Sequence, residues 1–231
     1  MAQSSILFIV SGPSGTGKTT LVEHLVRTLP NTMFSISYTT RPPRPGEENA
    51  REYYFVSREE FWAMVERGDL LEHASIFDQL YGTPRRNVEK AATEGKDLVL
   101  DIDAQGATQV KAQLPEAVAI FLLPPSRQEL ERRLRARGLD TPEGIQRRLE
   151  TARREIENFQ NYDYVIVNES YAQACREVEA IAQAERYARR SEALPAAELA
   201  AVTAQAAQCR KAARAHKVAA VLETFDLPAG D

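Results

Sequence analysis

Hydrophobic and polar positions along this chain fall into blocks that predict strands and helices in turn. Residues 6–10 form a continuous apolar run that ends at a glycine-rich turn, which is typical of a strand buried on both faces of a parallel sheet. A helical stretch follows at about 18–29. Short β-rich runs then lie at 97–102, 118–123 and 164–167, each separated from the next by a helix-length segment. This βαβ rhythm predicts an α/β fold around a parallel sheet.

The rhythm breaks first between about residues 35 and 95. This stretch contains a Pro/Arg-rich loop at 41–46, a strand-like segment at Tyr53–Val56, and a capping box at Ser57–Glu60 that opens a short helix. We therefore expect an inserted subdomain at 35–95.

A second break, at residues 126–158, is charged and helical. Ser126 and Glu129 form a capping box, and Thr141-Pro142 is typical of the start of a second helix, which we expect to end near Asn158. We predict a lid here, within one domain over 1–190 whose core is assembled from 1–34, 96–125 and 159–190. Residues 191–231 form an Ala-rich extension that we expect to be helical, with partial disorder as the alternative.

Composition narrows the class of partner. The chain has 231 residues, 43% of them hydrophobic, and a net charge of −4, so it can bury one sizeable core but does not carry a nucleic-acid footprint over its whole surface. A small anion is the expected partner, and a homo-oligomer is compatible with the sequence. Cys175 and Cys209 lack metal-ligand spacing, which favours reduced thiols. Because the N-terminus has neither a basic leader nor a long apolar span, we expect a cytoplasmic protein that does not enter the membrane.

The strongest chemical signal is a phosphate-binding loop between a predicted strand and a predicted helix, Gly12-Pro13-Ser14-Gly15-Thr16-Gly17-Lys18-Thr19. Its glycines let backbone N–H groups converge on phosphate oxygens at a helix N-terminus. Lys18 would reach the terminal phosphates, and the Thr19 hydroxyl could ligate Mg²⁺. We therefore expect ATP with Mg²⁺ to be bound by this loop and the following Thr20. A plain glycine-rich turn is the alternative.

Two acids follow the strand at 97–102, at the edge where ligands of open α/β sheets gather. Asp101 and Asp103 are two positions apart and so share a face of the strand. We expect Asp101 to hold the Mg²⁺ shell through a bound water, and Asp103 to accept hydrogen bonds from a base. The alternative is that they merely cap the helix that begins near Ala104.

Arginines crowd the second insertion, interleaved with acids, so a solvated salt-bridged face is the default interpretation. Arg147 and Arg154 each have glutamates at helical neighbour positions, which predicts that both are paired within the helix. Arg148 has no acid at those positions, Arg137 faces only Arg133 and Leu134, and Arg133 can pair with Glu129. Since phosphoryl transfer needs positive charge at the moving group, we predict catalytic roles for the lid residues Arg133, Arg137 and Arg148 beside Lys18.

The first insertion offers an acceptor site. Arg41 and Arg44 lie among prolines that stiffen the loop, and Tyr53 and Tyr81 can add phenol donors, a set that suits a monophosphate. Packing within a sheet is the alternative interpretation of the two tyrosines.

At this point the chain resembles a known family, the guanylate kinases of the bacterial type. The resemblance spans about residues 4–190 and is carried by Ser37-Tyr38-Thr39-Thr40-Arg41-Pro42-Pro43-Arg44-Pro45-Gly46-Glu47, Tyr53–Val56, Glu72, Tyr81-Gly82-Thr83, Asp101–Gly106, Arg133–Gly138, Arg148 and Val165–Asn168. It implies a P-loop nucleoside monophosphate kinase fold with a GMP-binding insertion and a helical lid, and transfer of phosphate from ATP to GMP, with deoxy-GMP as a further acceptor.

The resemblance also implies residue roles. Those toward guanine would fall to Ser37, Glu72, Thr83 and Asp103, and those toward the GMP phosphate to Arg41, Arg44, Tyr53 and Tyr81. Asn168 would lie near adenine. Position 83 is Thr where many members have Ser, and either hydroxyl could reach the base. No role transfers to the C-terminal extension.

Two competing functions remain from the residues. Guanylate-kinase-like domains of scaffold proteins dock phosphopeptides or proteins, but their ATP loops are usually damaged, whereas Gly12–Thr19 is intact here. A P-loop kinase acting on a sugar phosphate or another nucleotide is the second alternative. It is disfavoured by the combination of Ser37, Arg41, Arg44, Tyr53, Glu72 and Tyr81.

Overall fold

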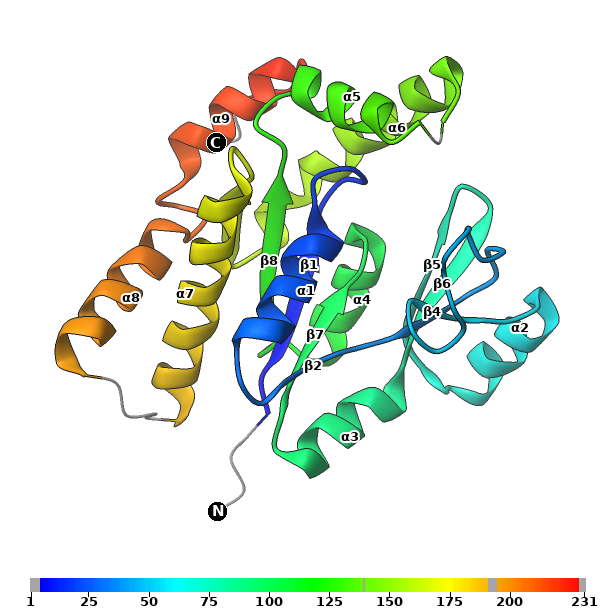
Figure 1. The fold of residues 1–231 in the computed structure, drawn as a ribbon, viewed down its shortest axis with the longest axis horizontal. Coiled ribbons are helices and arrows are strands. Elements are labelled where there is room, and N and C mark those ends of the chain that lie inside the picture. The colour runs from blue at the N-terminus through cyan, green and yellow to red at the C-terminus, as the bar shows by residue number, and fades with distance from the viewer. Residues whose placement is uncertain (1–4, 139, 191–194, 229–231) are drawn as a thin grey trace.

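The computed structural model describes residues 5–138, 140–190 and 195–228 and has an α/β core with two excursions (Figure 1). The expected boundaries at residues 1 and 191 lie outside the described residues. The core sheet has five parallel strands in the order β2-β7-β1-β8-β9, which are Thr32–Phe34, Asp97–Asp101, Leu7–Ser11, Val118–Leu123 and Tyr164–Val167. This is the parallel sheet that the βαβ rhythm predicts.

Both faces of the core sheet are buried, which explains its uninterrupted apolar strands. Phe8 and Val10 of β1 join one hydrophobic cluster, whereas Ile9 between them joins the other. The first cluster is covered by α1 and α7, and the second by α4, the lid helices and the last helix of the chain. The core helices are α1 (Lys18–Thr28), α4 (Ala104–Gln113) and α7 (Tyr171–Arg190). Helix α3 (Arg85–Glu94) lies within the range expected for the first insertion, but its Ala91 joins the second cluster of the core.

The first insertion is a four-stranded sheet with one helix and its own small core. The strands run in the order β4-β3-β6-β5, namely Tyr53–Phe55, Ser37–Thr39, Gln79–Pro84 and Leu70–Ile76, and the helix is α2 (Arg58–Arg67). Ser57 accepts the Glu60 N–H at 3.1 Å, so the predicted helix start is confirmed. The small core comprises Phe61, Met64, Leu70 and Leu80.

The second insertion consists of α5 (Arg127–Ala136) and α6 (Pro142–Ile156), followed by the 3₁₀ helix η1 (Glu157–Asn161). Their first turns are capped by Ser126, which accepts from Glu129 N at 3.1 Å, and by Thr141, which accepts from Gly144 N at 3.1 Å. Proline occupies the first turn of α6. Both helix starts that the sequence predicts are therefore confirmed. The helical pair lies at the top of Figure 1, above the carboxyl end of the sheet.

The C-terminal extension forms α8 (Ala196–Gln208) and α9 (Ala215–Thr224). Between them the chain pairs with the outer strand β9, where Val165 N donates to Cys209 O at 2.8 Å. Cys209 joins the hydrophobic cluster on one face of the sheet, and Val221 and Phe225 join the cluster on the other. The extension therefore covers the open edge of the core sheet. Within the described ranges, no helix is long and apolar enough to cross a membrane.

Candidate active site

The phosphate-binding loop lies between β1 and α1, at the centre of the core sheet. Gly12, Gly15 and Gly17 have φ values of 141°, 93° and 96°, a region that favours glycine, and a Cβ at Gly12 would overlap the Leu122 carbonyl. The Lys18 ammonium donates to Gly12 O at 2.6 Å and Pro13 O at 3.3 Å, so it is folded over the loop that it belongs to. Strand, loop and helix occur in the order that phosphate binding requires.

Thr19 and Asp101 lie side by side below this loop. The Thr19 hydroxyl donates to Asp101 Oδ2 at 2.7 Å, which joins the start of α1 to the end of β7. Hydroxyl and carboxylate oxygens are the hard donors that Mg²⁺ prefers, and Mg²⁺ takes its other ligands from phosphates and water. Within the described part of the chain, no group of three or more His, Cys, Asp or Glu side chains could hold a metal alone. The pair therefore fits a metal that arrives with a nucleotide.

Glu72, on β5, is a buried carboxyl at the floor of the first insertion. It accepts a hydrogen bond from the Thr83 hydroxyl at 2.6 Å, and burial raises its pKa to about 7. A Cβ at Gly106 would lie 3.0 Å from the Glu72 Cδ, so only glycine leaves this room. Thr83 is itself fully buried behind the carboxylate. Its hydroxyl orients Glu72.

Asp103 caps α4, because its Oδ1 accepts the Gly106 N–H at 2.9 Å. The helix-cap interpretation, offered above as the alternative, is therefore correct for Oδ1. The other oxygen, Oδ2, accepts from the Gln105 amide at 3.1 Å, and burial raises the pKa of the carboxyl. The contact with a base stays a prediction.

Arg41, Tyr53 and Tyr81 form a packed cluster on the insertion. The Arg41 guanidinium donates to Glu47 Oε1 at 2.9 Å and lies 5.5 Å from the Tyr53 ring centroid. Tyr53 meets Tyr81 edge to face at 5.8 Å, so the two rings do pack within the sheet as well as facing the cavity. Glu47 also accepts from the Arg44 backbone N–H at 2.7 Å, which fixes the loop and leaves the Arg44 guanidinium at the cavity.

The lid arginines correct the expectation from helical neighbours. Arg148 is paired: its Nε donates to Asp140 Oδ1 at 2.9 Å, an acid from the loop before α6, and its Nη1 donates to Ser14 Oγ at 3.2 Å. Arg147 and Arg154, predicted to be paired, make no side-chain hydrogen bond or close ion pair with any residue that the structure describes. Arg147 does act on its predicted neighbour Glu143, whose pKa is lowered by hydrogen bonds from its own backbone and Thr141 and by the charge of Arg147. Counting neighbours along one helix misses acids on the adjoining loop. What separates Arg148 from Arg147 is the helix face, since Arg148 lines the cavity and Arg147 is exposed.

Arg137 directly follows α5, and its guanidinium makes no hydrogen bond or ion pair with the described residues. Partial burial of its guanidinium lowers its pKa, and repulsion from Arg148 and Arg44 lowers it further. Three cations from three segments therefore converge on one region, where the Asp140 carboxylate, which pairs with Arg148, offsets only part of the repulsion on Arg137. Such an arrangement suits a polyanionic ligand.

Arg133 has a different position from the other two lid arginines. It pairs with Glu129 at 2.8 Å, as predicted, and its Nη2 donates to the Asn168 carbonyl at 2.9 Å. Asn168 in turn donates from Nδ2 to Thr16 O at 2.7 Å, while its buried Oδ1 has no hydrogen-bond partner among the described residues. Arg133 and Asn168 thus brace the back of the phosphate-binding loop.

A single cavity of about 950 Å³ collects most of the predicted site. It brings together residues of the loop, the first insertion, β7 and the lid: Gly12, Ser14, Gly15, Gly17, Lys18, Thr19, Thr20, Ser37, Arg41, Arg44, Tyr53, Glu72, Tyr81, Asp101, Asp103, Arg137 and Arg148. Five predicted residues do not line it, and they are Pro13, Thr16, Thr83, Arg133 and Asn168. Each of these five contacts a residue or loop that does, Pro13 through its carbonyl, which accepts from Lys18.

Comparisons with known proteins agree with this geometry. The guanylate kinase family model matches residues 4–185. The chain belongs to the guanylate kinase family. A guanylate kinase from Koribacter versatilis is 48% identical over 225 residues, covering 96% of each chain, and one from Salmonella typhi is 46% identical over 188 residues, covering 80% of this chain and 90% of its own length.

A solved structure of a relative agrees with the fold. A crystal structure of guanylate kinase from Anaplasma phagocytophilum has a TM-score of 0.65 and 38% identity, and the match covers 80% of this chain and 87% of that one. The fold is therefore that of the P-loop nucleoside monophosphate kinases, as the sequence predicts, and the chain is an ATP:GMP phosphotransferase.

Sequence reasoning missed two residues of this guanylate kinase site. Glu155, on α6, lines the cavity, its Oε2 is buried without a hydrogen-bond partner among the described residues, and burial raises its pKa to about 7. Phe77, at the end of β5, lines the cavity with an exposed ring. Neither position belongs to a motif with a recognisable chemical spacing. Only the folding of the lid over the sheet and the hairpin turn place them in the site.

Proposed function

We propose that this chain transfers the γ-phosphate of Mg²⁺-bound ATP directly to the phosphate of GMP, giving ADP and GDP, without a covalent enzyme intermediate. The observation that carries this assignment is the convergence of Lys18, Arg44, Arg137 and Arg148 on one cavity between the phosphate-binding loop and the first insertion. Phosphoryl transfer relies on positioning and charge stabilisation, and these side chains supply both.

The two substrates would lie at opposite ends of the cavity. The loop residues 12–20 bind the ATP phosphates, with Asn168 and Arg133 holding the loop in shape. Mg²⁺, held from the protein by Thr19 and through water by Asp101, would neutralise phosphate charge when bound. Lys18 leaves the loop carbonyls for the phosphates, and Arg137 and Arg148 stabilise the charge on the moving group.

GMP would be held by the first insertion. Arg41, Arg44, Tyr53 and Tyr81 bind its phosphate, while Ser37, Glu72 and Asp103 face the guanine. As a carboxylate, Glu72 accepts from guanine N1–H and the 2-amino group, which adenine does not offer on that edge. Thr83 orients that carboxylate through its hydroxyl. Closure of the lid excludes water that would hydrolyse ATP.

A coupled assay of ADP release tests the assignment across GMP, deoxy-GMP, AMP, CMP, UMP, dTMP and a phosphorylated sugar. We expect turnover with GMP, with deoxy-GMP as a further acceptor, and none with the sugar. Lys18→Ala should abolish transfer while the protein stays folded. Turnover with the sugar phosphate, or near-normal kcat for Lys18→Ala, would exclude the proposal.

The lid arginines offer a matched pair for the same assay. Arg148→Gln should lower kcat by about 10³-fold or more, as when a charge-stabilising arginine is lost from phosphoryl transfer. Arg147→Gln, one position along the same helix but exposed, should leave kcat nearly unchanged. Equal losses would show that the charge of the lid, and not the cavity position of Arg148, sets the rate.

A further inference from the structure

Phe77 occupies a backbone conformation that disfavours it. It follows Ile76 at the tip of the β5–β6 hairpin, where Ile76 pairs with Gln79, so Phe77 and Asp78 alone form the turn. Their φ values are 48° and 63°. A two-residue turn of this kind favours Asn-Gly, and a bulky residue with positive φ is a rare outlier. Such an outlier motivates a functional explanation.

The Phe77 ring is also an exposed apolar group in a polar cavity. It is 45% exposed, although it lines the cavity that holds the charged site residues. Its partner is the Arg148 guanidinium, whose Cζ lies 4.9 Å from the ring centroid. An arginine over an aromatic face is attracted by the ring quadrupole and keeps its N–H edges free for hydrogen bonds.

Arg148 thereby touches three parts of the molecule at once. Its Nε donates to Asp140 of the lid loop, its Nη1 donates to Ser14 of the phosphate-binding loop, and its face lies against Phe77 of the first insertion. Of these three contacts, only the stack on Phe77 depends on the position of the insertion that binds the acceptor. The stack is therefore a direct link between the acceptor subdomain and a lid arginine.

We propose that Phe77 is a positioning residue that couples the first insertion to the lid. By stacking on Arg148, it directs the remaining N–H groups of the Arg148 guanidinium toward the transferring phosphoryl group. The inference rests on the proposed catalytic role of Arg148. A planar guanidinium stacks through its two faces and donates hydrogen bonds through the N–H groups that lie in its plane. The ring fixes the plane, while Asp140 and Ser14 fix the rotation within it.

The coupling predicts a rate defect without a binding defect. Phe77→Leu keeps an apolar side chain and removes the π face, so kcat should fall by about 2- to 5-fold, the size of one cation–π contact at an exposed site. The KM values for GMP and ATP should change less than about twofold, because Phe77 acts through Arg148, which is assigned to the moving phosphoryl group and not to ground-state binding of either substrate. Phe77→Tyr, which retains the ring, should restore kcat. Trp62→Leu is the matched control, since Trp62 is 43% exposed on the same subdomain but outside the cavity.

A double-mutant cycle with Arg148→Gln separates coupling from a structural effect. If Phe77 acts through Arg148, Phe77→Leu should have no further effect on kcat in the Arg148→Gln background. Phe77→Gly gives a second signature, because it relieves the positive φ and should raise Tm while lowering kcat. A structural role predicts that both fall together.

The outcomes are distinguishable from failure of the proposed function. Wild-type enzyme that does not phosphorylate GMP, or an Arg148→Gln variant with unchanged kcat, overturns the assigned role of Arg148 and the coupling with it. Wild-type turnover with a large Arg148→Gln defect, but an undiminished Phe77→Leu effect in that background, overturns the coupling alone. So does a loss for Trp62→Leu that equals the loss for Phe77→Leu.

Discussion

The Glu72 carboxyl is buried and can accept more hydrogen bonds than the protein supplies to it. It is 3% exposed, its described hydrogen-bond partner is the Thr83 hydroxyl, and burial raises its pKa to about 7, with the nearby Asp103 charge adding to the effect. Because the folded pKa is above the ordinary value of 4.5, the folded protein binds more protons than the unfolded chain between these pH values. The contribution of Glu72 to stability is present below about pH 4.5 and is lost as the pH rises through about 7.

GMP binding should show the opposite pH dependence. Guanine needs the ionised carboxylate as its acceptor, so the KM for GMP should fall as the pH rises from about 6 to about 8, through the pKa of about 7. The GMP phosphate itself titrates near pH 6, so the comparison is with Glu72→Gln, which shares that substrate ionisation. Glu72→Gln should lose this pH dependence and about 2–5 kcal/mol in kcat/KM for GMP, while ATP affinity is kept. An equal loss of ATP affinity would make Glu72 a structural residue.

Gly106 and Gly144 provide a matched pair of substitutions. Each is the third residue of its helix and donates its N–H to the capping side chain, Asp103 for one and Thr141 for the other. A Cβ at Gly106 would press into the Glu72 carboxylate, whereas at Gly144 the nearest atoms are 3.4 Å away or more. Gly106→Ala should therefore raise the KM for GMP by about tenfold or more, because the added methyl group must displace the Glu72 carboxylate from its buried position.

Gly144→Ala should leave the KM for GMP unchanged and add the roughly 0.5–1 kcal/mol of stability expected for Ala over Gly in a helix. Substrate titrations and thermal melts of both variants check the pair. Equal KM values for Gly106→Ala and wild type would show that the carboxylate can move aside at little cost.

Residue types could be predicted from the sequence more reliably than their partners. Lys18 and Thr19 follow from a motif whose spacing is fixed by the chemistry of phosphate and metal, and Asp101 follows from its place at the end of a predicted strand. The partner of Arg148 did not follow, because Asp140 lies eight residues away, across a loop whose path the helical period does not describe. The need for glycine at position 106 was not predicted, because the side chain that requires it, Glu72, lies 34 positions earlier on another element.

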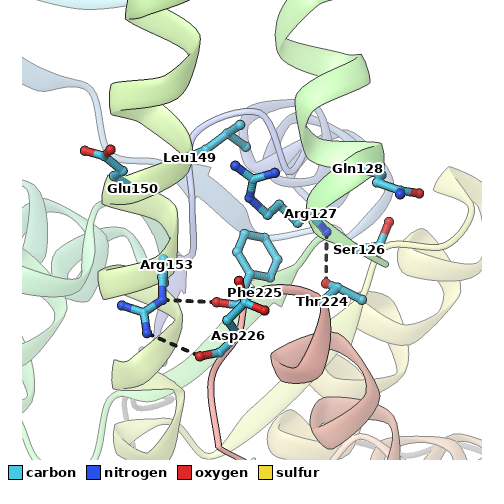
Figure 2. A pocket seen from close by; sticks show the side chains of 9 residues that line it. All are labelled: Ser126, Arg127, Gln128, Leu149, Glu150, Arg153, Thr224, Phe225 and Asp226. Atoms are coloured by element: carbon cyan, nitrogen blue, oxygen red, sulfur yellow. Dashed lines mark hydrogen bonds between the residues drawn. The ribbon is translucent and has the colours of Figure 1, made fainter.

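At the scale of elements, the last helix anchors the base of the lid. Arg153 on α6 donates to the Phe225 carbonyl at 3.0 Å and the Asp226 carbonyl at 3.3 Å, and the Arg127 N–H of α5 donates to Thr224 Oγ1 at 3.0 Å (Figure 2). A cavity of about 520 Å³ lies beside these contacts. Phe225 is 1% exposed and packs in the same cluster as Leu130 and Leu149 of the two lid helices. The two lid helices are therefore joined at one end by a segment from the C-terminal extension.

Arg153→Ala should destabilise the protein by about 1 kcal/mol, since an exposed arginine loses its bonds to two carbonyls at the end of α9. For a protein of this size the melting temperature should fall by about 2–4 °C. Arg154→Ala is the control: it sits on the same helix, loses the same charge and gains the same helix propensity, but its side chain makes no bond to the described residues. Differential scanning calorimetry of both variants decides the point, and equal melting temperatures would mean that the Arg153 bonds contribute nothing.

The types of the elements could be predicted from the local sequence, whereas the surfaces on which the C-terminal helices pack could not. Val118–Leu123 and Tyr164–Val167 are confirmed as strands at their predicted bounds, because an apolar β-branched run between breakers has few alternatives. The Ala-rich extension indicated helix, but alanine carries little information about which surface it will cover. Its contact with β9 and the lid depends on Cys209, Arg153 and Phe225, which come together only in the folded chain.

At the scale of the whole molecule, apolar burial is unequal between the parts that the site joins. The core sheet and its helices bury two large hydrophobic clusters, whereas the first insertion has its own cluster of four buried residues. Local stability follows the burial that an opening must expose. The insertion should therefore open at a lower free energy than the core, which suits a subdomain that must admit an acceptor and then close on it.

Trp62, the only tryptophan of the chain, lies on α2 of the insertion and packs edge to face on His73 of β5 at 6.0 Å, so its fluorescence reports on that subdomain alone. In urea, the fluorescence transition should precede the far-UV circular dichroism transition, to which the larger core contributes most of the signal. The proposed ligands of GMP include Glu72 of the insertion and Asp103 of the core. GMP should therefore raise the urea midpoint seen by fluorescence toward the midpoint seen by circular dichroism, so that the two transitions approach each other. ATP with Mg²⁺, bound mainly by the core and lid, should raise the circular dichroism midpoint and widen the gap, because it stabilises the part that is already the more stable. Coincident transitions without ligand, or an equal effect of both nucleotides on both probes, would show that the insertion and the core unfold as one unit despite their separate clusters.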